Sequence, residues 1–296
     1  MPMSRKISTG IGFLAVLMWA VLALLTAASG QVPPFELAAI TFFIGGVLGV
    51  LTWPFRPGAR KALKQSPLAW LVGIGGLFGY HAVYFSALRS APAIEASLIA
   101  YLWPLFLVVA SALLPGEKLR PHHLIGVVLG LIGAILVITK GEHLSLTEGL
   151  KPGHFLALVC AVIWAAYSVL SRKLGDVPTD AVVGFCLVTA FLAMLCHFAF
   201  EDTVWPASLS EWAAIIGLGV LPVGAAFYAW DYGVKKGDIM VLGASSYASP
   251  LLSTLVLVAT GFAPAHWSVG AACLLITLGA VIAAKDLLFR RVASST

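Results

Sequence analysis

The sequence predicts an all-α membrane protein with ten transmembrane helices arranged as two inverted five-helix repeats. Its composition, its ten apolar segments and a weak internal repeat support this prediction. Of the 296 residues, 60% are hydrophobic and only 10% are charged, and the mean hydropathy is +0.98. Soluble domains carry about 25% charged residues. A soluble protein of this length could not bury so much apolar surface, so the excess must face lipid.

Ten apolar segments of about 20 residues follow one another, and about 20 residues is the length of helix that crosses a bilayer core. We place them at 10–29, 36–54, 68–88, 93–114, 121–139, 153–172, 181–200, 211–230, 239–260 and 267–288. The first segment is longer than the apolar core of a signal peptide, so we expect it to be retained as a span. The longest polar stretch, 139–152, divides the chain. We therefore expect a first repeat at 1–140, a linker at 141–152 and a second repeat at 153–296.

The basic residues are distributed unequally between the two sides of this arrangement. With the N-terminus in the cytoplasm, fifteen of the 18 Lys and Arg residues lie on the cytoplasmic side, and only Arg89, Lys140 and Lys151 lie outside. This bias follows the positive-inside rule and places both termini in the cytoplasm. The net charge of +5 therefore reflects membrane topology, and we expect no nucleic-acid partner.

The two halves of the chain repeat each other weakly. A shift of 146 residues lays 84–104 over 230–250 without a gap, with Arg89 on Lys235 and Pro104 on Pro250. Trp19 pairs with Trp164 at a shift of 145. Because each half contains an odd number of spans, the halves must have opposite orientations, as in many secondary transporters.

Two spans, 93–114 and 239–260, contain a proline near the middle. Pro104 and Pro250 lack a backbone N–H, so the carbonyls of Ala100 and Ser246 lose their helical partners. Within lipid, such a carbonyl is tolerated only against protein or a wet cavity. Broken helices at matching places predict a binding site between the repeats at the midplane. We expect both prolines to act as pivots and both carbonyls to accept hydrogen bonds from a substrate ammonium.

Several aromatic residues lie well inside the predicted spans. Their N–H and O–H groups need partners away from water, so we expect them to face an interior cavity suited to a flat or amphipathic solute. Ordinary packing between helices is the alternative at each position. The aromatic candidates are Trp19, Tyr84, Tyr101, Trp103, Trp164 and Tyr247, with Ser246 beside the last.

Two titratable residues are candidates for function. His81 lies near the middle of the third span and shares a helix face with Tyr84, so its imidazole could bind a carboxylate or accept a hydrogen bond. A histidine that only links two helices is the alternative. Glu95 lies near a helix start, where a capping role competes with proton transfer. Asp231 and Lys235 are predicted to be solvated charges at the cytoplasmic edge.

Several other kinds of site are not expected. The four cysteines form no closely spaced pair, so neither a zinc site nor a disulfide framework follows. His122 and His123 have no neighbouring ligands in the sequence. No soluble-enzyme motif is present, so we expect no enzymatic activity, no metal and no cofactor. Glycine pairs such as Gly126 and Gly130 favour close packing inside one chain over dimerisation, so a monomer is expected.

The halves resemble two EamA-type repeats of the drug/metabolite transporter superfamily. The resemblance rests on Trp19 and Trp164, on YFSALRSAPAIEASLIAYLWPLF at 84–106 and on LLPGEKLRPHHLIGVVLGLIGAILVI at 113–138. Within the superfamily the chain is similar to YddG-type exporters of aromatic amino acids. It departs from the pattern at 261–264, which has no glutamate corresponding to Glu117.

The resemblance implies a bacterial inner-membrane transporter that exports aromatic amino acids and related amphipathic metabolites by alternating access. The residues alone do not give the direction of transport. One alternative is a proton-coupled drug/metabolite antiporter that uses His81 or Glu95. Another is a sensor or scaffold subunit that transports nothing. The expected substrate site consists of Trp19, His81, Tyr84, Tyr101, Trp103, Trp164, Ser246 and Tyr247.

Overall fold

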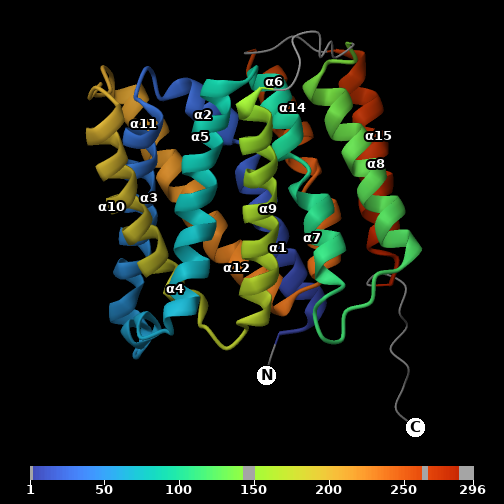
Figure 1. Cartoon of the computed structure of the whole chain (residues 1–296), viewed down its shortest axis with the longest axis horizontal. Coiled ribbons are helices and arrows are strands. Elements are labelled where there is room, and N and C mark those ends of the chain that lie inside the picture. Colours follow the sequence, from blue (N-terminus) through green and yellow to red (C-terminus); the bar gives the residue numbers. More distant parts are fainter. Residues whose placement is uncertain (1–2, 143–150, 262–265, 287–296) are drawn as a thin grey trace.

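The computed structural model describes residues 3–142, 151–261 and 266–286, and all regular structure in these ranges is helical. The main helices run side by side, with the N-terminus at one end of the bundle (Figure 1). They are α1 (Arg5–Trp19), α2 (Leu22–Ala28), α3 (Pro34–Thr52), α4 (Pro67–Ile74), α5 (Tyr80–Ser90), α6 (Ala93–Ala100), α7 (Trp103–Ser111), α8 (Pro121–Ile138), α9 (Pro152–Lys173), α10 (Val182–Phe200), α11 (Leu209–Val220), α12 (Ala226–Lys236), α13 (Ile239–Ser245), α14 (Ala248–Ala259) and α15 (Trp267–Ala283). Residues 143–150 of the predicted linker and the last ten residues of the predicted second repeat lie outside the described residues.

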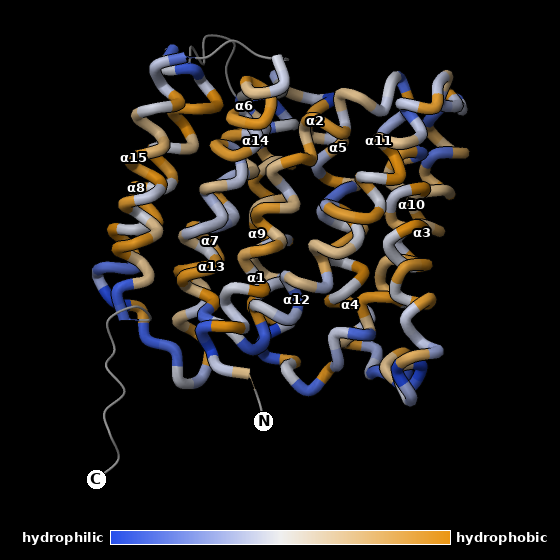
Figure 2. The backbone as a smooth tube through the Cα atoms, turned by 180° about the vertical axis from the view of Figure 1, so that it is seen from behind, coloured by the Kyte–Doolittle hydropathy of each residue, from blue (hydrophilic) through white to orange (hydrophobic). Residues whose placement is uncertain are grey.

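The helices have the length and composition of membrane spans. Among the described residues, eight helical stretches are long and apolar enough to cross a bilayer, and two shorter apolar helices cover Glu95–Ser111 and Trp267–Ala283. Apolar residues follow the helices, and hydrophilic residues gather in the connections at their ends (Figure 2). The prediction of an all-α, multi-pass membrane protein is confirmed.

Both helices that contain a central proline are broken. The first break, at 101–102, separates α6 from α7, and the second, at 246–247, separates α13 from α14. Pro104 and Pro250 are buried in the first turn of the following helix, where a missing N–H leaves no helical bond unmade. The Ser246 carbonyl accepts the backbone N–H of Ser249 at 3.0 Å, so the prediction that it lacks a partner is wrong.

The third span of each half contains a π-helical segment. The segments Gly75–Gly79 and Leu221–Ala225 are related by the same shift of 146 residues, as are the first residues of α5 and α12, of α6 and α13, and of α8 and α15. A π turn contains one more residue than an α turn and often lies at a functional site. The local backbone geometry therefore recurs along the chain together with the residue types.

Four helix pairs form the framework that surrounds the site. α1 packs on α12, α5 on α9, α3 on α10 and α8 on α15, and the last pair forms one edge of the bundle (Figure 1). Gly12 faces Gly233 in the first pair, and Gly126 faces Gly279 in the last. A Cβ atom at any of these glycines would overlap the neighbouring backbone. Small residues therefore allow these helices to approach closely, as is common in membranes.

Candidate functional site

Four tryptophans from four helices meet in the middle of the bundle. Trp19 ends α1, Trp103 begins α7, Trp164 lies in α9 and Trp230 lies in α12. Every pair of these rings is in contact, with centroid separations of 5.2 to 6.4 Å. Trp103, Trp164 and Trp230 are 6%, 4% and 0% exposed and are enclosed by protein, whereas Trp19 is partly exposed.

The indole N–H groups of the tryptophan cluster differ in their partners. Trp19 donates to the Pro222 carbonyl at 3.1 Å, within the second π-helical segment. Trp230 donates to the Ser168 hydroxyl at 3.0 Å. Within the described parts of the chain, the N–H groups of Trp103 and Trp164 have no protein acceptor. Both rings are buried, with Trp103 6% and Trp164 4% exposed.

Two tyrosines of α5 extend the aromatic surface beyond the tryptophan cluster. The Tyr80 ring lies 5.3 Å from Trp164 and stacks on Tyr84 with centroids 5.8 Å apart. The Tyr84 hydroxyl forms a hydrogen bond with the Ser97 hydroxyl at 3.2 Å. This bond links α5 to α6, the first half of the first broken helix.

His81 lies on α5 among aromatic rings. Its imidazole packs edge-on against Phe42, at 5.0 Å, and against Phe227, at 6.3 Å. Its Nδ1 lies 2.7 Å from the Leu77 carbonyl, which can only accept, so Nδ1 carries the hydrogen. In the neutral ring Nε2 is then a hydrogen-bond acceptor.

A cavity of about 470 Å³ opens beside the tryptophan cluster. A volume of this size is typical of sites for small molecules. The cavity lies between α1–α2 and α14, towards the end of the bundle opposite the N-terminus (Figure 1). Trp19 belongs both to the cavity wall and to the tryptophan cluster. The lining residues are Trp19, Leu22, Ala23, Thr26, Ala27, Tyr101, Ser249 and Ser253.

The structure brings six of the predicted site residues together. Trp19, Trp103 and Trp164 form the cluster, Tyr101 faces the cavity, and His81 and Tyr84 flank Tyr80. No hydrogen bond or ring contact joins Ser246 or Tyr247 to this group among the described residues.

Ser246 and Tyr247 are both 0% exposed. Tyr247 packs against Gly130 of α8, and the Ser246 hydroxyl donates to the Leu242 carbonyl at 2.7 Å. No ring contact joins Tyr247 to the tryptophan cluster within the described residues.

Trp230, Tyr80 and Phe227 were not predicted from the sequence. The internal repeat contains a signal for two of them, because the shift of 146 residues lays Trp230 on Tyr84 and Phe227 on His81. The partner positions of predicted site residues therefore point to further residues of the same site.

The prediction that Asp231 and Lys235 are solvated is wrong. Their side chains are only 1% and 4% exposed, and the Lys235 ammonium lies 2.8 Å from the Asp231 carboxylate. Thr179 donates to the same carboxylate at 2.7 Å, and Lys235 also donates to the Val177 carbonyl at 2.9 Å. A charged pair is stable in such a place only when both groups are hydrogen-bonded, as they are here.

Glu95 connects the first broken helix to α9. Its carboxylate lies 2.7 Å from Nε2 of His154. The Lys151 N–H donates to Nδ1 of His154 at 3.0 Å, so the hydrogen of the neutral ring is on Nε2 and is donated to Glu95. Glu95 is therefore not a simple helix cap but one side of a contact between α6 and α9.

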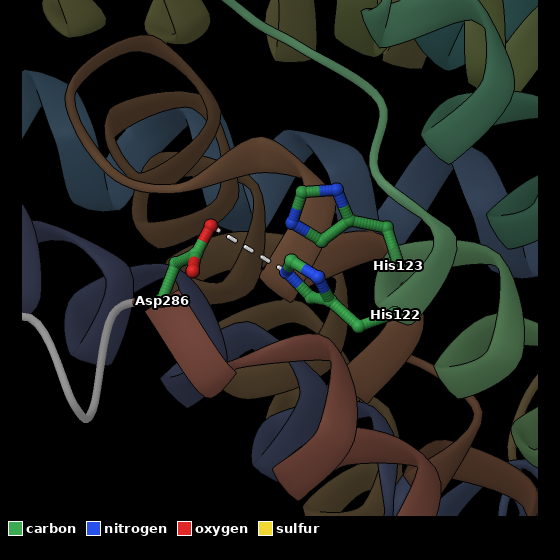
Figure 3. A group of neighbouring side chains, drawn as sticks. All are labelled: His122, His123 and Asp286. Carbon is green, nitrogen blue, oxygen red and sulfur yellow. Dashed lines mark ion pairs between the residues drawn. The ribbon is translucent and has the colours of Figure 1, made fainter.

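His122 and His123 have a third neighbour, Asp286, so the prediction that they have no neighbouring ligand is wrong (Figure 3). The chemistry does not fit a metal ion. The Arg120 N–H donates to Nδ1 of His123, which leaves the hydrogen on Nε2, and the Arg120 guanidinium pairs with Asp286 at 2.6 Å. We interpret the group as a helix cap joined to an ion pair.

A bundle of membrane-length helices around an aromatic cavity is the architecture of a membrane carrier. The EamA-like transporter family matches residues 7–139 and 151–284. The chain belongs to this family; its members are transporters and not enzymes.

Named relatives and a solved structure cover nearly the whole chain. The aromatic amino acid exporter YddG of Ancylobacter novellus is 51% identical over 290 residues, covering 98% of this chain and 100% of the relative. The protein of the same name from Escherichia coli K12 is 25% identical over 294 residues, covering 95% and 97%. A crystal structure of a protein that is 50% identical has a TM-score of 0.90 and covers 98% of this chain and 100% of its own.

Proposed function

We propose that this protein exports aromatic amino acids and related amphipathic metabolites across the bacterial inner membrane by alternating access. The observation that carries the proposal is the cavity of about 470 Å³ that ends on the tryptophan cluster. Aromatic faces suit a flat side chain and attract an ammonium group, and the free N–H groups of Trp103 and Trp164 suit a carboxylate. The name of the 51% identical relative supports this substrate class.

The proposed architecture is a monomer of ten spans in two inverted repeats, with both termini in the cytoplasm. The helix pairing supports it. Exchanging the halves turns the α1–α12 pair into the α9–α5 pair, while the α3–α10 and α8–α15 pairs each join equivalent helices. A pseudo-two-fold axis in the membrane plane requires this pattern. Eight helical stretches are long enough to span the membrane, and α6 with α7 as one span and α15 as another would bring the number of spans to ten.

The proposed binding residues are Trp19, His81, Tyr84, Tyr101, Trp103 and Trp164. Ser246 and Tyr247 would contribute when the turn between α13 and α14 moves. Pro250, buried at the start of α14, would be the pivot of that movement. Pro104, buried at the start of α7, would be the pivot of the equivalent movement between α6 and α7.

Transport by the purified protein in liposomes tests the proposal. Tryptophan uptake should exceed that of empty liposomes, and phenylalanine and tyrosine should compete better than the other amino acids. His81→Ala and Trp164→Ala should reduce uptake, whereas Trp205→Ala, at an exposed ring outside the helices, should not. An absence of flux for all twenty amino acids would contradict the proposal and favour a sensor or scaffold.

A proton-coupled antiporter is the second candidate, and the 2.7 Å contact between Glu95 and His154 favours it. This ionisable pair joins the first turn of a broken helix to the first turn of α9, and such pairs in membrane proteins often mark a proton path. Uptake measured with and without a pH gradient separates the two candidates. If the flux does not respond to the gradient, the coupled mechanism is excluded.

A further inference from the structure

Four charged side chains from four segments meet at the end of the bundle opposite the cavity. Arg5 begins α1, Glu117 lies between α7 and α8, Arg172 lies near the end of α9, and Asp238 caps α13. Arg5 lies 2.9 Å from Glu117 and 3.1 Å from Asp238, and Arg172 lies 2.5 Å from Glu117. The N-terminus marks this end in Figure 1.

Glu117 is at the centre of this group. Its side chain is 8% exposed and pairs with two guanidinium groups. Hydrogen bonds between charged groups are stronger than neutral ones, and the bond to Arg172, whose side chain is 19% exposed, is less screened than the bond to Arg5, whose side chain is 43% exposed. The carboxylate therefore holds the α7–α8 connection against both α1 and α9.

Arg172 is itself fixed to the end of α12. It donates to the carbonyls of Val234, Lys235 and Gly237 at 2.9, 3.2 and 2.8 Å. The last carbonyls of a helix have no helical partners, and these bonds satisfy three carbonyls at that point. Arg172 therefore has a fixed position, and Glu117 of the α7–α8 connection pairs with it.

The other half of the chain cannot form the same group. The shift of 146 residues lays Glu117 on Ala263 and Asp238 on Pro92. The Glu95–His154 contact joins α6 to α9, the equivalents of α13 and α1, so part of the group has a counterpart at the opposite end. No carboxylate corresponds to Glu117, and the two ends therefore differ in the charged contact that holds the connection between the fourth and fifth spans.

We propose that Glu117, Arg5 and Arg172 form a latch that closes the cytoplasmic end and favours the conformation open to the other side. The inference rests on the proposed alternating access and adds the residues that set its resting state. Substrate that enters from the cytoplasm must first break the latch. A change that weakens one closed state shifts the population towards the other.

Two single-cysteine reporters test the latch without any substrate. Ser8 is fully buried and lies eleven residues before Trp19 on α1, about three helical turns away and thus on the same face. Ser253 lines the cavity. With Glu117→Gln, Ser8→Cys should react with a membrane-impermeant maleimide from the cytoplasmic side roughly tenfold faster, which corresponds to the loss of a charged hydrogen bond. Ser253→Cys should react more slowly from the opposite side.

Matched variants separate the latch from a general loosening of the protein. Glu142→Gln removes an exposed carboxylate just after α8 and should leave both rates unchanged. Arg5→Gln leaves the Arg172–Glu117 pair, so it should act in the same direction as Glu117→Gln with a smaller effect, and the double variant should show less than the sum because the two changes share the Arg5–Glu117 pair. Equal rates at Ser8→Cys with and without Glu117→Gln, or faster reaction at both reporters, would overturn the proposal. A failure to transport aromatic amino acids would leave these labelling results unchanged.

Discussion

At the scale of single residues, two tryptophans of the cluster differ in what their indole N–H groups bond to. The Trp230 N–H donates to Ser168, whose hydroxyl donates in turn to the Trp164 carbonyl at 2.9 Å, so Trp230 joins α12 to α9. The Trp164 N–H has no acceptor in the described protein. Trp230 is therefore a structural member of the cluster, whereas the unpaired N–H of Trp164 is the donor that we propose for a substrate.

Replacing each of these rings by phenylalanine separates the two roles. Trp164→Phe keeps an aromatic face but loses the free donor, so we expect the KM for tryptophan to rise about fivefold or more, the loss of one hydrogen bond of about 1 kcal/mol. Trp230→Phe should lower stability by about 1 kcal/mol and leave KM nearly unchanged. Liposome kinetics and thermal unfolding of the purified variants measure both. Equal KM changes in the two variants would contradict this assignment.

The sequence predicts which of these residues face the interior better than it predicts their partners. Trp19 and Trp164 were predicted because an indole N–H in the middle of a span needs a partner inside the protein. Asp231 was misplaced because its position near a helix end does not specify its face. Lys235 lies four residues after Asp231, the spacing of a helical ion pair, whereas Thr179, which also satisfies the carboxylate, is not linked to it by any short-range pattern.

At the scale of helices, the interruptions have different origins. The breaks before Pro104 and Pro250 were predictable, since proline ends the hydrogen-bond ladder. The turn between α1 and α2 contains neither proline nor glycine at 20–21, so no local signal indicates it. The π-helical segments were also not predicted, because an extra residue in one turn leaves the apolar pattern intact.

Two glycines in the first π-helical segment give a matched pair of variants. A Cβ atom at Gly76 would overlap the Tyr167 ring, whereas Gly79 has open space around it. Gly76→Ala should therefore destabilise the protein by about 1–3 kcal/mol, since overpacking displaces a buried ring. Gly79→Ala should be neutral or slightly stabilising, because alanine favours helix. Thermal unfolding in detergent compares them, and equal midpoints would show that the Gly76–Tyr167 contact does not limit stability.

At the scale of the whole molecule, the repeat was predictable but the long-range charge pairs were not. The shift of 146 residues is visible in the sequence because proline, arginine and tryptophan positions recur. Arg5 and Glu117 are 112 residues apart, and they meet only because α1, α9 and the α7–α8 connection converge. Such a pairing depends on packing, and no local spacing encodes it.

The number of membrane spans depends on whether α15 crosses the bilayer. α15 has 17 residues, or about 26 Å at 1.5 Å per residue, which is slightly shorter than a typical core of about 30 Å. The Lys and Arg distribution nevertheless predicts that α15 crosses, because Lys285, Arg290 and Arg291 would otherwise lie outside, against the positive-inside rule. Alkaline phosphatase fused after residue 142 should be active, and the same reporter at the C-terminus should be inactive. Activity at both positions would mean that the second half makes an even number of crossings, and the inverted repeat would then be excluded.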